Sequence, residues 1–357
     1  MKLRKPNVKN QKVQKIVDAA SIGIDDAVSA IKESGLPNKP LISSIAELTG
    51  LKKKKSAQLV ESMQATEQIA SDTHQMSFAF LGGGSFGTAM ANLAAKNGCD
   101  ATLWVRDKRT VKSLHKTRIN KKYLPNHKLD ERLKFGGPSS AFREMLTNIK
   151  PFITHQAVVS LTKGMEKETF AMMSDIIQEV LPEVNFGVMS GPNLAVEIMD
   201  NMPTATVIAS ASEPLRKAIQ TALHSAFFRV FASSDIKGVE LGGALKNIYA
   251  IAMGMAAAYD VGVNTKAMLL TRALAEMSRF GVAVGADPLT FLGLSGVGDL
   301  YATCSSVLSR NYRIGYMLGQ GISLEHAIKK LGQTAEGVNT ILQVHSRAKA
   351  LGIYMPI

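Results

Sequence analysis

The sequence has few cysteines, the residues that cross-link small folds through disulfides or bind structural metals. It contains two cysteines in 357 residues, Cys99 and Cys304, which lie too far apart for a cysteine zinc site or a disulfide framework. No apolar run reaches the ~20 residues that a membrane-spanning helix needs. The basic N-terminal residues have no apolar stretch behind them, so they do not form a secretory signal. These absences are typical of a cytoplasmic protein.

The composition predicts a folded chain with anionic partners. Hydrophobic residues make up 46% of the sequence, enough for a sizeable core, and the length predicts two or three domains. The formal net charge is +13. Such a balance suits phosphorylated ligands, although charge by itself says nothing about the fold.

Residues 1–75 differ from the rest of the chain. Apolar residues recur there at helical spacing, and glycine and proline interrupt them between residues 35 and 40. The run 52–55 consists of four lysines. We interpret this region as a helical N-terminal extension. A nucleic-acid-binding module is the less favoured alternative, because no aromatic residue or motif supports it.

From residue 76 onward, short apolar segments alternate with helical segments. The expected strands are residues 77–81, 101–105, 157–161, 186–189, 205–209 and 230–232. The expected helices between them include residues 88–97, 169–180 and 214–224. Alternation of this kind predicts a mostly parallel sheet covered on both faces.

After about residue 233 the strand pattern stops and helices follow one another. The expected helices are residues 236–258, 266–280, 311–318 and 324–331. The fold class is therefore α/β, with a dinucleotide-binding domain over residues 76–235, an all-α domain over residues 236–357 and the helical extension over residues 1–75.

A glycine-rich turn follows the first expected strand. Gly82-x-Gly84-x-x-Gly87 joins that strand to a helix, which is the context that gives this spacing its meaning. Such glycines permit a tight turn, the approach of a diphosphate and close helix packing, while the helix N-terminus attracts the phosphates. At the end of the second strand stand Arg106 and Asp107. An acid there favours NAD and an arginine favours NADP. With both residues present the choice of cofactor stays open, and Arg106 favours NADP.

The same turn also fits a different reaction class. Gly83-x-Ser85-x-Gly87 matches the nucleophile elbow of α/β-hydrolases. That alternative needs a downstream histidine, for which His224, His326 and His345 are available. None of these histidines stands in a recognisable motif, so we rank this hypothesis second.

Several segments together resemble one enzyme family. They are Gly82-Gly-Gly-Ser-Phe-Gly-Thr-Ala89, Leu161-Thr-Lys-Gly164, Ser190-Gly-Pro-Asn193, Gly242-Gly-Ala-Leu-Lys-Asn247, Gly296-Val-Gly-Asp-Leu300 with Ser309-Arg-Asn311, and Gly332-Gln-Thr-Ala-Glu-Gly337. In order and spacing this set is similar to NAD(P)-dependent glycerol-3-phosphate dehydrogenases over residues 76–357. The resemblance implies a Rossmann-like domain before a helical one. It also implies interconversion of dihydroxyacetone phosphate and sn-glycerol 3-phosphate with NAD or NADP, for phospholipid synthesis. Residues 1–75 have no counterpart in the family's usual chain, and relatives continue beyond residue 357.

Lys246 is the candidate proton donor and acceptor. It lies in an otherwise apolar helix, and burial lowers the pKa of a lysine towards neutrality. By periodicity alone a surface lysine is equally acceptable, and the resemblance decides for catalysis. Lys163 follows an apolar strand and is expected at the carboxyl edge of the sheet, where ligands bind. Asp299, in a glycine-rich turn, is expected to orient Lys246 or a substrate hydroxyl.

The remaining site residues follow from the glycine turn and from the resemblance. The expected substrate-binding residues are Lys163, Gly191, Asn193, Lys246, Asp299, Ser309, Arg310 and Asn311. The expected cofactor-binding residues are Gly82, Gly84, Ser85, Phe86, Gly87, Arg106, Lys163, Ala195, Arg310, Thr334 and Glu336. We expect a small phosphorylated triose as the ligand, and neither a metal nor a nucleic acid as a partner. A homodimer is a possible oligomeric state.

Overall fold

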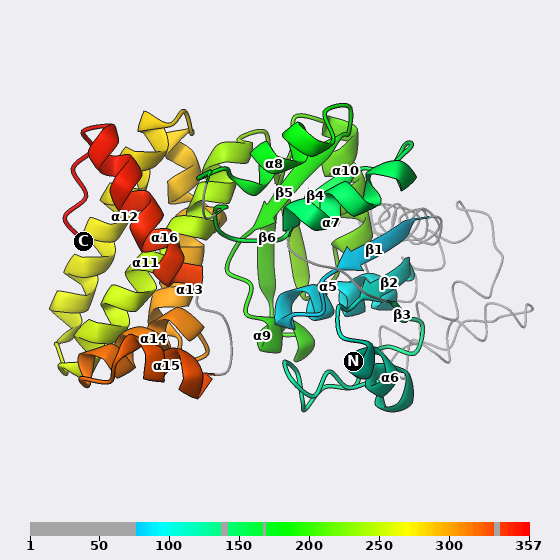
Figure 1. Cartoon of the computed structure of the whole chain (residues 1–357), viewed down its shortest axis with the longest axis horizontal. Coiled ribbons are helices and arrows are strands. Elements are labelled where there is room, and N and C mark those ends of the chain that lie inside the picture. Colours follow the sequence, from blue (N-terminus) through cyan, green and yellow to red (C-terminus); the bar gives the residue numbers. More distant parts are fainter. Residues whose placement is uncertain (1–75, 137–141, 167–168, 332–335) are drawn as a thin grey trace, which may run out of the picture. The chain divides into compact units, whose positions relative to one another are not determined.

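The structure of the chain, a computed structural model, describes residues 76–136, 142–166, 169–331 and 336–357 (Figure 1). The helical extension expected over residues 1–75 lies outside the described residues. Among the helices that are described, none is long and apolar enough to cross a membrane.

The first half of the described chain builds two sheets and the helices around them. Its elements are β1 (Ser77–Leu81), α5 (Ser85–Lys96), β2 (Asp100–Trp104), α6 (Lys108–Thr117), β3 (Lys134–Gly136), α7 (Phe142–Ile149), η1 (Lys150–Phe152), β4 (Val158–Ser160), α8 (Met173–Val180), β5 (Phe186–Ser190), α9 (Ala195–Met199), β6 (Thr204–Ala209), α10 (Glu213–Leu223) and β7 (Phe228–Ser233). β1, β2 and β3 form a parallel sheet in that order. β4 to β7 form a second sheet, in which β5 and β6 are antiparallel and the other pairs are parallel.

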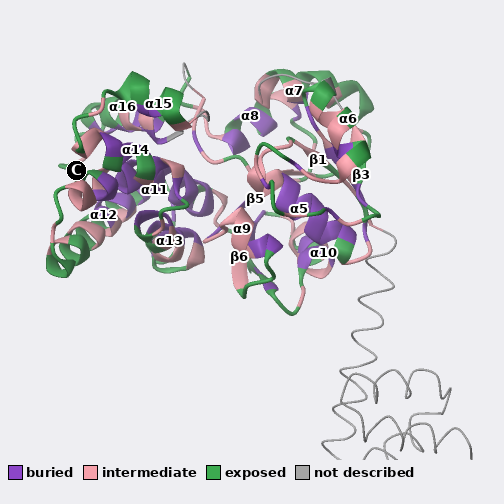
Figure 2. Ribbon diagram, turned by 90° about the horizontal axis from the view of Figure 1, so that it is seen from below, coloured by how far each residue is buried: buried purple, intermediate pink, exposed green. Residues whose placement is uncertain are grey.

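Helix α5 joins these two sheets through a common core. Two-thirds of its residues are buried, most of them alanines and other small side chains that allow close packing (Figure 2). Its Met90 belongs to the same apolar cluster as Leu103 of β2, Ile208 of β6 and Phe228 of β7. The glycine-rich turn immediately before α5 is therefore anchored to the centre of this half of the molecule.

Helices alone make up the second half of the described chain. They are α11 (Ile236–Ala258), α12 (Val263–Ala283), η2 (Pro288–Leu292), η3 (Leu294–Gly298), α13 (Asp299–Ser305), α14 (Arg310–Gly319), α15 (Leu324–Leu331) and α16 (Glu336–Ala350). α11 is mostly apolar and its residues 238–251 are all buried, which is typical of a helix packed on every side over that stretch. It packs against β5 and is surrounded by α12, α13, α14 and α16 (Figure 1). Residues on α11 are thus held between the sheet and the helical part.

Most of the expected elements are confirmed, and the differences have local causes. The expected helix over residues 169–180 is wrong at its start, because α8 begins at Met173. Ahead of it the chain makes a tight turn in which Met165 bridges to Met172 and Phe170 has a φ of 61°. The expected elements do not include strand β3 or helices α6, α7, α9, α13 and α16. The expected single sheet is two sheets with one antiparallel pair.

Candidate active site

The glycine-rich turn has the geometry that a diphosphate requires. Gly82 has a φ of +138°, and a Cβ on Gly87 would collide with the carbonyl oxygen of Gly82. Around Gly84 a Cβ would meet nothing within 4 Å, so this face of the turn is open. Gly84 is the N-cap of α5, and no side chain among the described residues caps the helix there. The first N–H groups of α5 are thereby left for an anion, and the turn fits the cofactor expected from the sequence.

The end of β2 separates the roles of Arg106 and Asp107. The Asp107 carboxylate accepts hydrogen bonds from the backbone N–H groups of Arg109 (3.2 Å) and Thr110 (2.9 Å) and from the Thr110 hydroxyl (2.6 Å). These bonds, the Thr110 hydroxyl foremost, lower the pKa of Asp107. Asp107 is therefore the N-cap of α6, whereas the Arg106 side chain is exposed.

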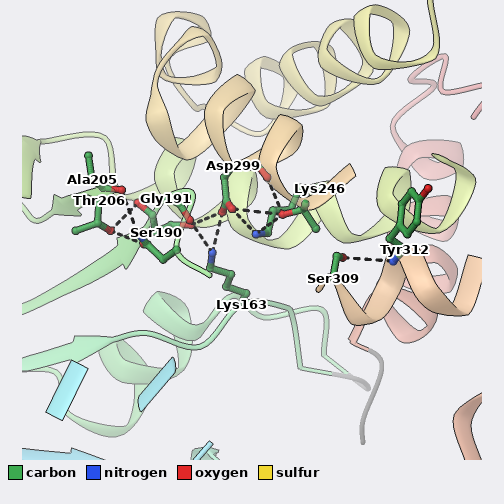
Figure 3. Close-up of polar contacts among 11 residues, drawn as sticks. Lys163, Ser190, Gly191, Ala205, Thr206, Lys246, Asp299, Ser309 and Tyr312 are labelled. Carbon is green, nitrogen blue, oxygen red and sulfur yellow. Dashed lines mark hydrogen bonds and ion pairs between the residues drawn. The ribbon is translucent and has the colours of Figure 1, made fainter. Parts of the chain in front are cut away.

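A carboxylate shared by two lysines forms the centre of the site (Figure 3). Asp299 is almost completely buried and stands at the start of α13. One of its oxygens accepts from the Lys163 ammonium at 2.7 Å, and the other accepts from the Lys246 ammonium. Lys163 also donates to the Gly191 carbonyl oxygen at 3.2 Å. The three residues come from the segment after β4, from α11 and from α13, and the fold brings them together.

Lys246 is buried, as expected from its apolar helix, with 7% of its surface exposed. Burial lowers the pKa of its ammonium to about 8, with the positive charge of Lys163 acting in the same direction and Asp299 opposing both. A pKa near 8 is in the range in which a lysine both gives and takes protons at physiological pH. Lys246 also donates to the Thr303 hydroxyl at 2.8 Å.

Thr303 is a site residue that sequence reasoning missed. It lies four residues after Asp299 on α13, so both side chains are on one face of that helix. Its hydroxyl donates to the Asp299 carbonyl oxygen at 2.7 Å and accepts from Lys246. The expected glycine-rich turn at Asp299 is wrong, because Asp299 opens a helix after the π-helical segment η3. Had that helix been expected, the spacing of four would have indicated Thr303.

Two glycines of α11 explain how Lys246 reaches its partners. A Cβ on Gly242 would collide with the carbonyl oxygen of Ser295 in η3, and one on Gly243 would crowd the Ser190 hydroxyl at the end of β5. Their absence of side chains lets α11 approach the segment before Asp299 on one side and the sheet edge on the other. The Gly-Gly-Ala-Leu-Lys-Asn segment thus places Lys246 one turn beyond two close contacts.

The cofactor turn lies beside this lysine centre. The Lys163 ammonium is 6.0 Å from the centroid of the Phe86 ring, and Phe86 lies within the Gly82–Gly87 segment, at the start of α5. Lys163 therefore lies next to the turn, and through Asp299 it is joined to Lys246. This neighbourhood joins the cofactor and substrate residues that the sequence predicted separately.

The expected substrate loop is fixed to the second sheet. The Asn193 amide donates to the Ala205 carbonyl oxygen at 3.0 Å and accepts from the Thr206 hydroxyl at 2.8 Å. Asn193 thus holds the loop that carries Gly191, while Ala195 opens α9 and packs on the core of the first half. The role of Asn193 in binding substrate stays a prediction.

Ser309, Arg310 and Asn311 stand at the start of α14, which packs along α11. The Ser309 hydroxyl caps α14 by accepting from the Tyr312 N–H at 3.3 Å (Figure 3). Asn311 is buried and accepts from the Gly337 N–H at 3.2 Å, which ties it to the start of α16. Arg310 is half-buried between them. Thr334 and the side chain of Glu336 lie outside the described residues.

The hydrolase alternative gains no support from the geometry. Ser85 is the first residue of α5, and within the described ranges it has no hydrogen bond to a histidine. Of the three candidate histidines, His224 and His345 are exposed, and His326 contacts the Ser323 hydroxyl at 2.7 Å. A nucleophile elbow requires a base beside the serine.

Comparison with known proteins agrees with this site. The model of the NAD-dependent glycerol-3-phosphate dehydrogenase N-terminus matches residues 77–137 and 135–216, and that of the C-terminus matches residues 235–357. A protein of Psychrobacter cryohalolentis named glycerol-3-phosphate dehydrogenase [NAD(P)+] is 63% identical, covering 97% of this chain and 81% of its own length. An Acinetobacter baumannii protein of the same name is 64% identical over 78% of this chain and 82% of its own length.

The match to the Psychrobacter protein extends into residues 1–75, so the expectation that this region lacks a counterpart is wrong for that relative. Among solved structures, glycerol-3-phosphate dehydrogenase from Coxiella burnetii superposes with a TM-score of 0.75 at 36% identity, covering 79% of this chain and 92% of that protein. The two family models together span most of the chain, and the match to the C-terminal model begins at residue 235, one residue before α11. The chain belongs to the NAD-dependent glycerol-3-phosphate dehydrogenase family.

Proposed function

We propose that this chain reduces dihydroxyacetone phosphate to sn-glycerol 3-phosphate, and catalyses the reverse reaction, with NAD(P)H in the cytoplasm, supplying the glycerol backbone of phospholipids. The observation that carries the proposal is the pair of lysines held by one buried aspartate beside an open glycine turn. Its relatives' name and the family match support the same reaction.

Each lysine keeps one donor for substrate. An ammonium has three N–H groups, and within the described part of the chain Lys246 has Asp299 and Thr303 as partners, while Lys163 has Asp299 and Gly191. One N–H of each lysine is thereby left over. Two such donors suit the C2 oxygen of a triose, where negative charge develops during reduction.

In the proposed mechanism Lys246 gives its proton to the C2 oxygen of the ketone, and takes it back when the alcohol is oxidised. When bound, the reduced nicotinamide supplies the hydride to C2. Lys163 polarises the same carbonyl, and Asp299 holds both ammonium groups. Arg310, at the start of α14, binds the substrate phosphate by charge-assisted hydrogen bonds. Residues 82–87, Arg106 and the start of α16 hold the cofactor.

We further propose that NADPH is preferred to NADH. The Asp107 carboxylate, the group that would read a free ribose 2′-hydroxyl, already accepts three hydrogen bonds as the cap of α6. Arg106 is exposed beside it and would attract a 2′-phosphate. Replacing Arg106 with alanine should raise the KM for NADPH and leave that for NADH nearly unchanged.

The test is the oxidation of NADPH and of NADH by pure protein, followed at 340 nm with and without dihydroxyacetone phosphate. Oxidation that depends on the ketone phosphate, and that dihydroxyacetone itself does not support, is expected. Lys246→Met serves as the inactive control. No ketone-dependent oxidation with either cofactor would refute the proposal.

The division into a cofactor-binding domain over residues 76–235 and a substrate domain over residues 236–357 is also a proposal. The start of α11 at Ile236, where strands give way to helices, supports it. The homodimer stays a prediction, which light scattering of the purified chain would test.

A further inference from the structure

A buried asparagine outside the predicted site contacts the glycine-rich turn. Asn120 lies in the segment between α6 and β3 and has no exposed surface. Its amide nitrogen donates to the Gly83 carbonyl oxygen at 3.0 Å and to the Thr88 hydroxyl at 2.9 Å. Both amide hydrogens are therefore used, one on the turn and one on the first turn of α5.

The bond to Gly83 fixes the direction of the next N–H group. In a trans peptide the C=O and the following N–H point in opposite directions. With the Gly83 carbonyl held towards Asn120, the Gly84 N–H faces the other way, and it has no hydrogen-bond partner among the described residues. Gly84 is also the position where an added Cβ would meet open space. Asn120 thus turns an unpaired backbone donor towards the open side of the turn.

The segment that carries Asn120 is itself braced. Arg118, at the end of α6, has a φ of 52°, and its guanidinium donates to the carbonyl oxygens of Leu129 (3.3 Å), Asp130 and Leu133 (2.7 Å). The Asn120 carbonyl accepts from the Leu124 N–H at 2.8 Å. A segment closed on itself in this way holds Asn120 against the turn without help from a ligand.

The side-chain oxygen of Asn120, unlike its nitrogen, makes no hydrogen bond among the described residues. This oxygen is buried. Leaving a buried acceptor unpaired costs folding free energy, and an apolar side chain would avoid that cost. The two donated hydrogen bonds, rather than the packing of this side chain, account for an asparagine here.

We propose that Asn120 is a positioning residue of the dinucleotide site, which orients the Gly83–Gly84 peptide so that the Gly84 N–H binds the diphosphate of NADPH. The inference rests on the proposed function, since it requires a dinucleotide at this turn. Asn120 acts through the backbone and does not touch the cofactor.

The test compares Asn120→Ala with Asn92→Ala. Asn92 is an equally buried asparagine on α5, and it pairs with the same segment through the Asp130 N–H at 2.7 Å, away from the glycine turn. Both variants lose a buried amide and are expected to lose folding stability. Trp104, the single tryptophan of the chain, ends β2 beside the turn, so quenching of its fluorescence reports NADPH binding.

The dissociation constant for NADPH should rise about tenfold or more in Asn120→Ala, as expected for a hydrogen bond to a charged group. In Asn92→Ala it should change less than about twofold, in line with a site that the variant does not touch. The affinity for adenosine 2′-monophosphate, which has no diphosphate, should be the same in Asn120→Ala as in the wild type. Asn120→Leu, which has nearly the same shape and cannot donate, replaces the alanine variant if that fails to fold.

Unchanged NADPH binding in a folded Asn120 variant, or an equal loss for adenosine 2′-monophosphate, would overturn the inference. An equal loss in Asn92→Ala would do the same, because it would make the effect one of stability. A wild type that binds neither NADPH nor NADH would instead refute the proposed function, and if only NADH binds, the same comparison of variants is made with NADH.

Discussion

Replacing Asp299 with asparagine should shift the pH dependence of the reaction to lower pH. Burial and the charge of Lys163 lower the pKa of Lys246, and the Asp299 carboxylate opposes them, with a pKa of about 8 as the result. Asparagine has nearly the same shape but no charge. In Asp299→Asn both remaining influences act downwards, so the pKa of Lys246 must fall.

The size of the shift follows from the distance and the burial. An opposite charge within hydrogen-bond reach typically moves a pKa by about 1–3 units, or about 1.4–4 kcal/mol. Asp299 has 1% of its surface exposed, so solvent screens little of this interaction. We therefore expect the pKa of Lys246 in Asp299→Asn to lie about 1–3 units below that of the wild type.

The assay is kcat/KM for the triose against pH in both directions, because kcat/KM reports the pKa values of groups before the substrate binds. Reduction needs the ammonium form of Lys246, so its rate should fall as pH rises through about 8 in the wild type, and oxidation should rise over the same range. In Asp299→Asn, the fall in the reduction rate and the rise in the oxidation rate should both move to lower pH. Thr303→Val is the matched control, because it removes a neutral partner of Lys246 and leaves the carboxylate in place.

If the pH transitions stay unchanged in Asp299→Asn, or move to higher pH, the Asp299 charge does not raise the pKa of Lys246 and the reasoning is refuted. A shift of equal size in Thr303→Val would show that the hydrogen bonds, and not the charge, set the pKa.

Three further predictions concern single side chains. Lys246→Met should lower kcat by at least about a hundredfold, the usual share of a general acid, while NADPH binding measured by fluorescence stays within about twofold; retained turnover would show that the proton comes from elsewhere. Arg310→Ala should raise the KM for dihydroxyacetone phosphate by about tenfold or more and change the KM for NADPH much less, since a charged hydrogen bond to phosphate is lost; equal changes in steady-state assays would contradict the phosphate role. Glu240 is buried on α11, where it accepts from the Ser174 N–H at 3.0 Å, and burial raises its pKa to about 7 from an ordinary value of 4.5. The folded state then binds more protons than the unfolded state between these values, so the free energy of unfolding should fall by about 3 kcal/mol as pH rises across that window. Urea unfolding at pH 4.5 and 8 should show this loss in the wild type and not in Glu240→Gln, and a variant with the same pH dependence as the wild type would exclude Glu240 as its source.

Much of the fold could be predicted from the sequence because its signals are local. β1, the glycine turn and α5 follow one another, and hydrophobic runs with glycine breaks are enough to find them. The bounds of α11 and α15 were predicted correctly for the same reason. The start of α8 was not, because a bridge between Met165 and Met172 and a residue with positive φ displace it, and neither leaves a periodic pattern.

The separate roles of Arg106 and Asp107 show where local signals run out. The sequence places an acid and a base together at the end of β2, and it cannot say which one faces a ligand. Asp107 is followed three residues later by Thr110, whose hydroxyl and N–H bind the carboxylate. A capping interpretation of Asp107 was therefore available from the spacing, but the structure was needed to show that the carboxylate is occupied.

By itself the sequence predicted a half of alternating strands and helices before a helical half, and a glycine-rich turn between the first strand and its helix, since each depends on neighbours within a few residues. It offered Lys163 and Lys246 as candidates, and for Lys246 the resemblance decided between catalysis and a surface position. The expected pairing of Asp299 with Lys246, 53 residues away, is present. The tertiary structure alone decided that Asp299 also binds Lys163, 136 residues away, and that Asn120 reaches back 37 residues to the glycine turn. Such contacts depend on how α11, α13 and the sheet edges pack, and a local sequence pattern does not predict the distances between packed elements. The pKa of Lys246 belongs to the same class, because burial and both neighbouring charges exist only in the folded chain.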